Sequence, residues 1–491
     1  MLDFESWLRL HGPFDLSSQP VCIGPSLLLG AGQCLVATRA LKRGDVVLTV
    51  PRTLIVSSAH QRIVECPHQL ALRKSDWHDS AANVVELALT LLIERLKGRE
   101  SFFAPYIDAV LAPLQFTDHL SQWTDEQLAW LSFADAAAVA DEASFAHRLH
   151  ANLAETHLDA QQKRLEALWI TAWRDFVCPF LCERQLLAEP DAAQNYALFV
   201  WALCTVWSRG YWVGGVPCLV PVADMANHLG RGLAFFGSVA DLLESGTVSE
   251  ADVASARASP ANADDDQFFN CGAFRLVTNR DVAAGDEVFI SYGCDNRSSL
   301  ADYGFVLTQA EDADLDVAVA AAFPHFAAAR FSSVQMSMCV SAEPVWPEAL
   351  NADGDAFSDV WTLACEPGRL PGALMRSLRF AMWVSERVDD DDDDDEDEVR
   401  QKLSDDTALS AHNERRVLEH LDRQLQTWLD VFVELPARQF GDSDADARRR
   451  FSYAQQLRAG ERHLVLHWRD MVSAQARESC TTAVVETAQK R

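Results

Sequence analysis

The residues Pro221-Val222-Ala223-Asp224-Met225-Ala226-Asn227-His228 place polar side chains in a largely apolar stretch, and the later residues Phe289-Ile290-Ser291-Tyr292-Gly293 end a strand-like run on a tyrosine. Apolar neighbours hold such polar groups in place, which is typical of a small-molecule site. A structural interpretation competes, because Asp and Asn side chains often satisfy free backbone N–H groups at a helix start. The interpretation as a small-molecule site with chemistry requires that the two stretches meet in the fold.

Composition limits the class of protein. A chain of 491 residues is too long for one core and predicts two or three domains, and 49% hydrophobic residues are enough to fold most of it. The formal net charge is −30. Nucleic-acid backbones and anionic membrane surfaces would repel such a chain, so we expect neither as a partner. Basic or neutral proteins are the expected partners.

The twelve cysteines are scattered, and the closest pair, Cys178 and Cys182, has no second pair to complete a zinc site. We therefore expect mostly buried thiols and no metal. The N-terminal residues 1–5 include acids where a signal or transit peptide has basic residues, and no apolar run reaches the ~18 residues of a membrane-spanning helix. These features predict a soluble protein of the cytosol or nucleus.

Short β-prone runs predict a meander of strands over residues 21–50. Within it, Gly30-Ala31-Gly32 lacks the third glycine and the following helix of a dinucleotide-binding loop, although close backbone approach to a ligand remains open. Residues 57–209 show helical periodicity instead, and the last helix carries Arg209 at its C-terminal end. The helix dipole also favours a cation there, so simple capping is the alternative interpretation of Arg209.

The second half of the chain changes character twice. Residues 241–267 are acidic and alanine-rich, which predicts a surface insertion. Strand patterns then flank Gly285-Asp286, a turn pair that predicts a hairpin. From residue 310 the pattern is helical, and the ten consecutive acids at 389–398 repel one another, so we expect a solvated loop, with capture of basic protein segments as its functional alternative. The order of elements predicts an α+β chain.

Ordered motifs over nearly the whole chain resemble those of the SET-domain methyltransferases. Within them the chain is similar to the group typified by the Rubisco large-subunit methyltransferase and the actin-histidine methyltransferase. In chain order the motifs are Leu35-Val36-Ala37-Thr38-Arg39, Gly44-Asp45, Val50-Pro51, Leu89-Thr90-Leu91-Leu92-Ile93-Glu94-Arg95, Ala104-Pro105-Tyr106, Trp201-Ala202, Ser208-Arg209, Pro221 to His228, Ile290 to Gly293, Tyr303-Gly304-Phe305-Val306, Asn413-Glu414 and Arg458-Ala459-Gly460-Glu461-Arg462.

The resemblance implies a β-rich SET fold over residues 1–309, interrupted by a helical insert at about 57–209. A pseudoknot between the Asn227-His228 stretch and the Tyr292 stretch would close the pocket for S-adenosylmethionine. An all-α, substrate-binding-like domain over residues 310–491 would follow, and a protein substrate would dock on it.

The resemblance also implies roles for individual residues. Asn227 and His228 would hold the two ends of the cofactor, and Arg209 would face its carboxylate, a contact that a planar guanidinium suits. Asp224 belongs to the same set, with a structural role as its alternative. The backbone at Ala31, Gly32 and Gln33 and the side chain of Tyr292 complete the cofactor-binding residues that we expect.

Three features depart from the group's pattern. The cofactor loop usually reads Glu-Gly-x-Gly, whereas Ala31-Gly32-Gln33-Cys34 stands here, so an acidic contact and a glycine are missing. Ser298-Ser299 stand where the group more often has Glu-Leu. The insertion at 241–267 lies close in sequence to the expected pocket and could shape substrate entry.

Methyl transfer from a sulfonium to an amine requires a dry site that aligns the nucleophile with the methyl carbon. A lysine, with a pKa of about 10.4, is mostly protonated at neutral pH and must first lose a proton. A low-dielectric channel favours that loss, and a tyrosine hydroxyl can orient the lone pair. We assign this role to Tyr292 and the second hydroxyl of the amine pocket to Tyr303. The alternative for both is a half-buried strand tyrosine.

Three functions follow. The first is an S-adenosylmethionine-dependent methyltransferase acting on lysine in a non-histone protein. The second is transfer to histidine, whose imidazole is partly neutral at pH 7 and needs less deprotonation. The third is a SET-fold binding module that has lost turnover, as the altered Ala31 to Cys34 loop would allow.

Overall fold

The computed structural model describes residues 3–12, 14–26, 32–58, 79–131, 158–187, 193–213, 216–228, 234–235, 273–278, 281–290, 292, 296–307, 333–337, 360–364, 372–386, 399, 401–402, 408–432, 434–441 and 444–489. The expected acidic segments at 241–267 and 389–398 lie outside these residues, as does Ala31. The chain divides into two compact units. The first comprises Met1–Gln122, Lys163–Cys294 and Ser298–Phe305, and the second comprises Trp123–Gln162, Asp295–Arg297 and Val306–Arg491.

The strands of the first unit form three small antiparallel sheets. One is a two-stranded sheet of β1 and β2, one has the order β3-β7-β6, and one pairs β4 with β5. The predicted short strands over residues 21–50 are thus confirmed where the structure describes them, but β3 pairs with the distant β7 and not with β2. The bounds are β1 (Val21–Pro25), β2 (Gln33–Ala37), β3 (Val46–Pro51), β4 (Gly210–Val213), β5 (Val216–Leu219), β6 (Ala234–Phe235) and β7 (Ala273–Thr278).

The predicted hairpin around Gly285-Asp286 is wrong. β7 pairs with β3 on one side and, at its last two residues, with β6 on the other. Glu287 and Val288 lie beside β2 instead, where Glu287 faces Val36 and the Val288 N–H donates to the Leu35 carbonyl at 2.8 Å. This pairing brings the Tyr292 stretch next to β2.

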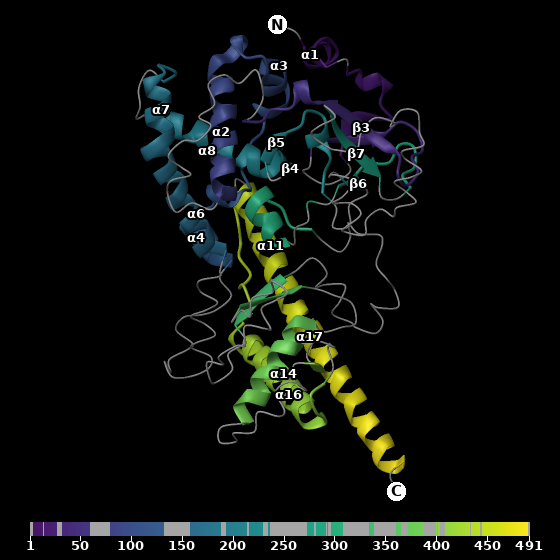
Figure 1. Ribbon diagram of the computed structural model, residues 1–491. Coiled ribbons are helices and arrows are strands. Elements are labelled where there is room, and N and C mark those ends of the chain that lie inside the picture. Colours follow the sequence, from purple (N-terminus) through teal and green to yellow (C-terminus); the bar gives the residue numbers. More distant parts are fainter. Residues whose placement is uncertain are drawn as a thin grey trace. The chain divides into compact units, whose positions relative to one another are not determined.

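Helices make up much of the remaining first unit. In α2 the apolar positions at i, i+3, i+4, i+7 and i+8 from Val84 are all buried, as the sequence predicts. α8 packs against α2 and ends at Arg209, as expected. The β4–β5 pair lies between these helices and the β3-β7-β6 sheet (Figure 1). The helices of this unit are α1 (Phe4–His11), α2 (Asp79–Lys97), α3 (Ala104–Tyr106), α7 (Cys178–Glu183) and α8 (Ala193–Arg209), with a π-helical turn at Ser299–Tyr303. Two further helices, α6 (Leu158–Ala172) and the short α11 (Asn296–Ser298), each contain residues of both units.

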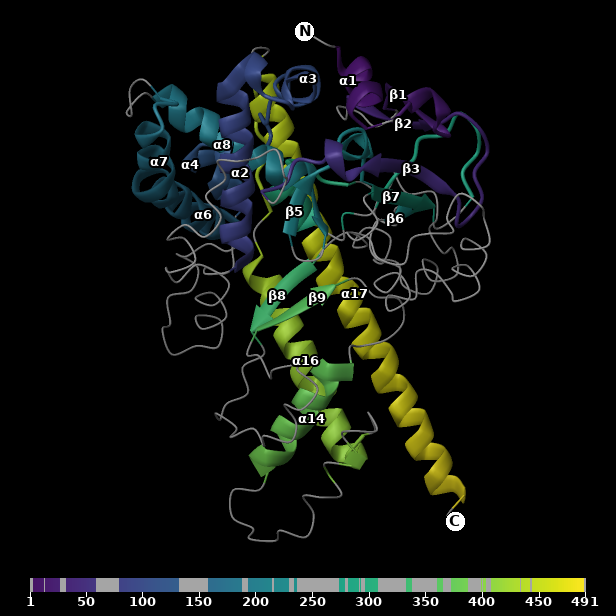
Figure 2. The ribbon, with the colours of Figure 1, turned by 45° about the horizontal axis from the view of Figure 1, so that its top comes forward.

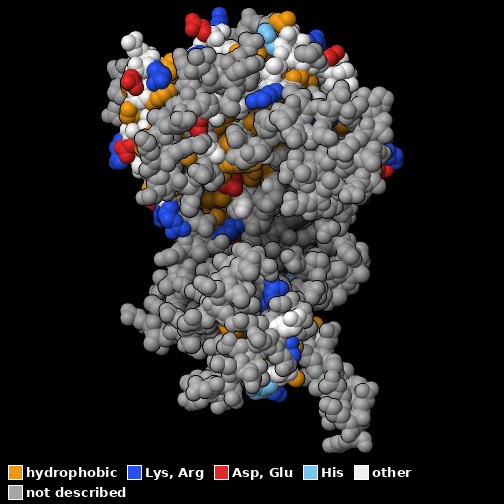
Figure 3. Space-filling model, viewed as in Figure 1, with side chains coloured by type: hydrophobic (Ala, Val, Ile, Leu, Met, Phe, Trp, Pro, Cys, Tyr) orange, Lys and Arg blue, Asp and Glu red, His pale blue; other side chains and the backbone are white. Residues whose placement is uncertain are grey.

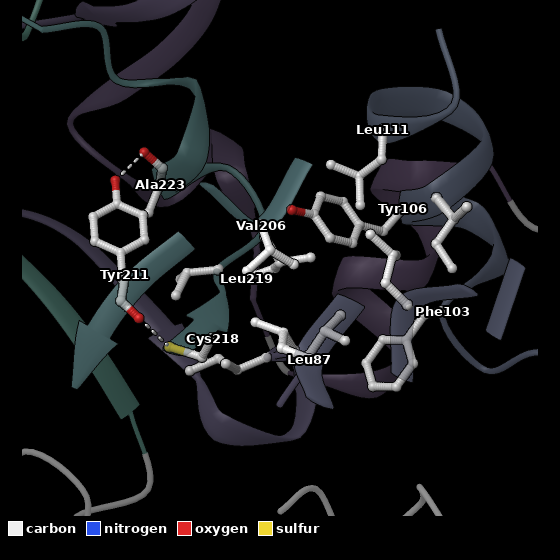
Figure 4. Packing of buried hydrophobic residues seen from close by; sticks show 14 of the residues in the cluster. Leu87, Phe103, Tyr106, Leu111, Val206, Tyr211, Cys218, Leu219 and Ala223 are labelled. Atoms are coloured by element: carbon white, nitrogen blue, oxygen red, sulfur yellow. Dashed lines mark hydrogen bonds between the residues drawn. The ribbon is translucent and has the colours of Figure 1, made fainter. Parts of the chain in front are cut away.

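One continuous core joins these elements. Leu87 of α2, Val206 of α8 and Leu219 of β5 pack together beside Phe103 (Figure 4). Each of these side chains is almost completely buried, so the core fixes the end of α8 relative to β5 and the chain that follows it.

The described residues of the second unit include the helices α14 (Gly372–Glu386), α16 (Ala411–Val431) and α17 (Ala445–Gln489) and the short α4 (Asp125–Leu128). α16 packs against both α14 and α17 (Figure 2), and Trp428 and Trp468 are fully buried in their shared core. The predicted long helical faces at 417–432 and 451–468 are confirmed, except that Phe432 lies just past the end of α16.

The second unit is not all-α. β8 (Ser333–Ser337) pairs antiparallel with β9 (Val360–Ala364). These strands differ from the predicted helical pattern because each is only five residues long and both lie among residues whose composition indicates helix. The expectation of an all-α C-terminal domain is therefore wrong.

Within the described part of the chain, no helix is both long and apolar enough to cross a bilayer. Acidic and basic side chains are interspersed on the face of the first unit that Figure 3 shows. Cys34, Cys204 and Cys218 are buried, as expected, and burial raises the pKa of each thiol to about 12. Cys22, in contrast, is exposed.

Candidate functional site

The two stretches that opened the sequence analysis lie side by side. His228 and Ile290 form a parallel bridge, and the Ile290 N–H donates to the Asn227 carbonyl at 2.9 Å. Residues more than sixty positions apart in the chain therefore share one short stretch of β-like pairing. The prediction that these stretches meet is confirmed, whereas the pseudoknot stays a prediction.

The chain segment that leads to the bridge between His228 and Ile290 begins with a strained residue. Val222 has φ +74° and ψ −48° and is fully buried. A β-branched residue with positive φ is rare, and such backbones persist only where the surroundings enforce them. A single 3₁₀ turn at Ala223–Met225 follows, and it directs the chain toward Asn227 and His228.

Three side chains, two from residues 209–211 and one from Tyr292, donate to the carbonyls of this turn and of the residue after it. The Tyr211 hydroxyl donates to the Ala223 carbonyl at 2.7 Å (Figure 4). The Arg209 guanidinium and the Tyr292 hydroxyl donate to two further carbonyls, those of Asp224 and Ala226, at 2.8 and 3.0 Å. Buried carbonyls need partners, and these bonds explain how the strained turn is held.

Arg209 and Asp224 form one buried network with Tyr106. Nη1 of Arg209 lies 3.4 Å from Oδ2 of Asp224, and the Tyr106 hydroxyl donates to the same oxygen at 2.7 Å. Burial raises the pKa of Asp224, although Arg209 and Tyr106 act in the opposite direction. Burial and the neighbouring carboxylate raise the pKa of Tyr106 well above its ordinary value. Asp224 thus orients Arg209, the structural role that the sequence left open.

The Arg209 side chain keeps 22% of its surface exposed, while that of Asp224 has none. Its hydrogen bonds to Asp224 engage only Nη1, which leaves Nε and Nη2 able to meet a ligand carboxylate. The simple capping interpretation is not supported by these contacts, because they are made with the turn at 223–225. Tyr106 was not among the expected site residues, since its partner is 118 positions away in the chain.

His228 is 3% exposed and contacts Tyr292 in two ways. Its Nδ1 accepts the Tyr292 N–H at 3.0 Å, and the two rings stack with centroids 4.8 Å apart. The Ile290 carbonyl is more distant from the same nitrogen, at 3.3 Å. Burial lowers the pKa of His228 to about 4, so the imidazole is neutral at physiological pH. An accepting Nδ1 places the proton of the neutral ring on Nε2.

The two predicted catalytic tyrosines are in contact. The rings of Tyr292 and Tyr303 lie 4.5 Å apart at 35°, and Phe305 lies 6.0 Å from both Tyr303 and His228. Tyr292 and Tyr303 are each half-buried. Tyr292 donates its proton to the Ala226 carbonyl, and a phenolic oxygen that donates a hydrogen bond can also accept one. Donating to a carbonyl also makes that oxygen a better acceptor.

The Asn227 side chain faces a buried carboxylate. Its Nδ2 donates to Oε1 of Glu287 at 2.7 Å, and Ser26 Oγ lies 3.0 Å from both oxygens of Glu287. Glu287 also contributes, after burial, to the raised pKa of the Cys34 thiol. Sequence reasoning missed Glu287 and Ser26, because no local pattern around either residue shows a contact with partners 60 or 261 positions away.

The expected cofactor loop is only partly described. Gly32 has φ +73°, and the site where a Cβ would stand is open, so backbone conformation accounts for this glycine. Its carbonyl accepts the Ser26 N–H at 2.9 Å. Gln33 begins β2 opposite Pro25 with an exposed side chain. The loop is thus tied at both ends to strands that reach Glu287.

Comparison with known proteins defines the class of fold. No protein-family model matches the chain. A crystal structure of the SET domain of LSMT bound to lysine and AdoHcy aligns over 97% of this chain and 91% of its own, with a TM-score of 0.56 and 16% identity. A structure of Rubisco LSMT bound to AdoMet aligns over 97% and 92%, with a TM-score of 0.56 and 17% identity. The chain therefore has the fold of these SET-domain proteins.

Particular relatives follow from the sequence. Protein SET DOMAIN GROUP 40 of Arabidopsis thaliana is 24% identical over 296 residues, covering 59% of this chain and 54% of the relative. Actin-histidine N-methyltransferase of Drosophila melanogaster is 26% identical over 262 residues, covering 49% and 42%. The matches span about half the length of these relatives. The resemblance to the SET-domain methyltransferases that the motifs indicate is confirmed.

Proposed function

We propose that this chain is an S-adenosylmethionine-dependent protein methyltransferase that transfers the methyl group to a lysine of a non-histone protein. The observation that carries the proposal is the placement of Tyr292 against His228, with its hydroxyl proton on the Ala226 carbonyl and its ring on Tyr303. Solved neighbours with this fold bind AdoMet, AdoHcy and lysine, which supports both the cofactor and the acceptor.

The residues of the site fit the cofactor. Arg209 has guanidinium nitrogens that its bonds to Asp224 do not use, and it is already oriented by that buried carboxylate. Asn227 is held with its amide nitrogen on Glu287, so its carbonyl oxygen can accept from an amine. S-adenosylmethionine would supply an electrophilic methyl group on a sulfonium.

The chain's own contribution is positioning. The Tyr292 oxygen, which donates to Ala226, would accept one N–H of the neutral acceptor amine and so direct the amine lone pair. The ring of Tyr303 packs against Tyr292 and restricts its rotation. The neutral His228 adds no positive charge that would oppose a cationic cofactor or an approaching ammonium.

Removal of the Tyr292 hydroxyl tests the assignment. Tyr292→Phe keeps the stacking on His228 and Tyr303, so we expect the dissociation constant for S-adenosylmethionine to change less than about threefold while methyl transfer falls at least about 100-fold. Calorimetry measures the binding. Mass spectrometry of a cell extract incubated with labelled methyl donor measures the transfer and identifies the modified residue.

Tyr196→Phe is the matched control, because Tyr196 packs on Trp173 and Phe199 in the helical part of the first unit, away from the contacts described above. We expect this variant to behave as the wild type. Wild-type protein that binds no S-adenosylmethionine would refute the proposed function, and full transfer by Tyr292→Phe would refute only the role of Tyr292.

Histidine as the acceptor is the second candidate, and it is favoured by the match to the actin-histidine N-methyltransferase. Methylhistidine in place of methyllysine in the labelled extract would select it. A binding module without turnover is the third candidate, and it predicts unchanged partner binding by Tyr292→Phe with no labelled product at all. Docking of the protein substrate on the second unit, and location in the cytosol or nucleus, remain parts of the proposal.

A further inference from the structure

Glu287 has no role in the methyl-transfer chemistry proposed above. Its side chain is buried, with 4% of the residue exposed, yet it collects hydrogen bonds from separate segments. Asn227, which directly precedes His228, donates one hydrogen bond to Glu287, and Ser26, the residue that follows β1, donates another. Cys34 of β2 supplies a third contact. A buried carboxylate is costly without such partners, so its retention at this point calls for a reason.

The carboxylate fixes which end of the Asn227 amide faces inward. The Asn227 amide nitrogen donates to Oε1 of Glu287 at 2.7 Å. The amide carbonyl oxygen then points away from Glu287. In the part of the chain that the structure describes, no donor reaches this oxygen, and Asn227 is only partly buried. Asn227 therefore presents an acceptor of fixed direction.

Glu287 also connects this amide to the strands around the expected cofactor loop. Ser26 directly precedes residues 27–31, and Cys34 follows Gly32 by two positions. The Ser26 N–H donates to the Gly32 carbonyl, so the two ends of the loop are joined at the same place. A shift of Glu287 would therefore move the Asn227 amide relative to Ser26.

We propose that Glu287 is a positioning residue that orients the Asn227 carbonyl oxygen toward an amino group of the methyl donor and holds it in register with Ser26 and β2. The inference rests on the proposed function. Glu287 touches neither the reacting atoms nor the ligand in this role, and it acts through Asn227. This role supplies, from a distant segment, the acidic group that the loop sequence lacks.

Exchange of the two partners gives the sharpest test. Asn227→Asp alone brings two carboxylates together, and we expect the dissociation constant for S-adenosylmethionine to rise about tenfold or more. Adding Glu287→Gln restores a hydrogen bond between positions 227 and 287 and leaves one carboxylate oxygen at position 227 facing outward. The double variant should therefore recover binding to within about threefold of wild type. The recovery requires the two residues to act as a pair.

Truncation supplies an independent measurement. Glu287→Ala should raise the dissociation constant about tenfold in the wild-type background and less than about twofold in Asn227→Ala, because the coupling disappears with its partner. Tyr196→Phe, which alters a side chain packed on Trp173 and Phe199 away from these contacts, is the control and should leave binding unchanged. Thermal melting without ligand accompanies each variant, so that loss of fold is detected separately.

Two results would overturn the inference. Equal effects of Glu287→Ala in both backgrounds would make Glu287 a stabiliser of the fold alone, and failure of the exchange to restore binding would show that Asn227 does not depend on it. Both results presuppose that the wild-type protein binds S-adenosylmethionine. Its failure to bind would instead refute the proposed function.

Discussion

His228 acts on Tyr292 through one ring nitrogen. Its Nδ1 accepts the Tyr292 N–H, and the ring stacks on the tyrosine. An asparagine oxygen can take the place of Nδ1, whereas a glutamine amide reaches instead to the position of Nε2. We therefore expect His228→Asn to retain most methyl transfer and His228→Gln to lose at least about tenfold in turnover, measured with saturating cofactor. Equal loss in both variants would contradict a role for Nδ1.

The same residue makes stability depend on pH. The pKa of His228 is lowered from 6.5 to about 4 by burial, so the unfolded chain takes up a proton at a pH where the folded chain does not. Its contribution is therefore complete above pH 6.5 and is lost as the pH falls toward 4, by up to about 3 kcal/mol. His228→Asn should flatten this part of the melting-temperature profile. The pKa values of His119 and His420 are also about 4, so part of the dependence of the melting temperature on pH should persist in that variant.

Sequence alone identified the site residues that belong to local patterns. Asn227, His228 and Tyr292 stand beside apolar runs, and Arg209 ends a periodic helix. Tyr106, which donates to Asp224 beside Arg209, and Glu287, which accepts from Asn227, were not identified as site residues in this way. Their roles arise from contacts across 118 and 60 positions, which only the fold creates.

At the scale of elements, helices were easier to predict than strand pairing. The periodic faces of α2, α8, α16 and α17 carry their own evidence, because a helix closes its hydrogen bonds within one segment. A strand must find a partner elsewhere, so a turn signal at Gly285 suggested a hairpin although β7 was already paired on both edges. Weak short strands such as β8 and β9 are missed for the same reason.

The turn after the π-helical Ser299–Tyr303 places Tyr303. Gly304 has φ +79°, and a Cβ there would lie 2.8 Å from backbone atoms of Asp118 and His119. Backbone cannot move aside cheaply, so we expect Gly304→Ala to cost about 2–4 kcal/mol in unfolding free energy. Displacement of Tyr303 should also lower methyl transfer. Chemical denaturation and the transfer assay measure the two effects.

Gly285 provides the control for that substitution. It has a similar φ of +89°, but nothing lies within 4 Å of its Cβ position. Gly285→Ala should therefore cost only the backbone strain, about 1–2 kcal/mol, and leave transfer unchanged. If the two variants lose equal stability and equal activity, close approach to Asp118 and His119 does not matter.

At the scale of the whole molecule, charge is the dominant feature. The net charge of −30 creates an electrostatic potential that acts over longer distances than any single contact, and removing the ten acids at 389–398 would still leave −20. A field of this size attracts basic proteins and is screened by salt, since the Debye length falls to about 8 Å at physiological ionic strength. Recognition of a basic protein substrate should therefore weaken as salt rises.

We expect the KM for the protein acceptor to rise about fivefold or more between roughly 25 and 200 mM NaCl, while the dissociation constant for S-adenosylmethionine changes less than about twofold, because the short-range contacts of Arg209 and Asn227 are screened far less. Initial rates with the acceptor identified in the labelled extract measure the KM, and calorimetry measures the dissociation constant.

A variant in which the acids at 389–398 are replaced by neutral residues separates the effect of this tract from that of the whole net charge. If the tract alone attracts the substrate, this variant loses the salt dependence, and if the whole charge does, it keeps most of it. A KM that does not respond to salt in either protein would mean that an uncharged surface selects the substrate.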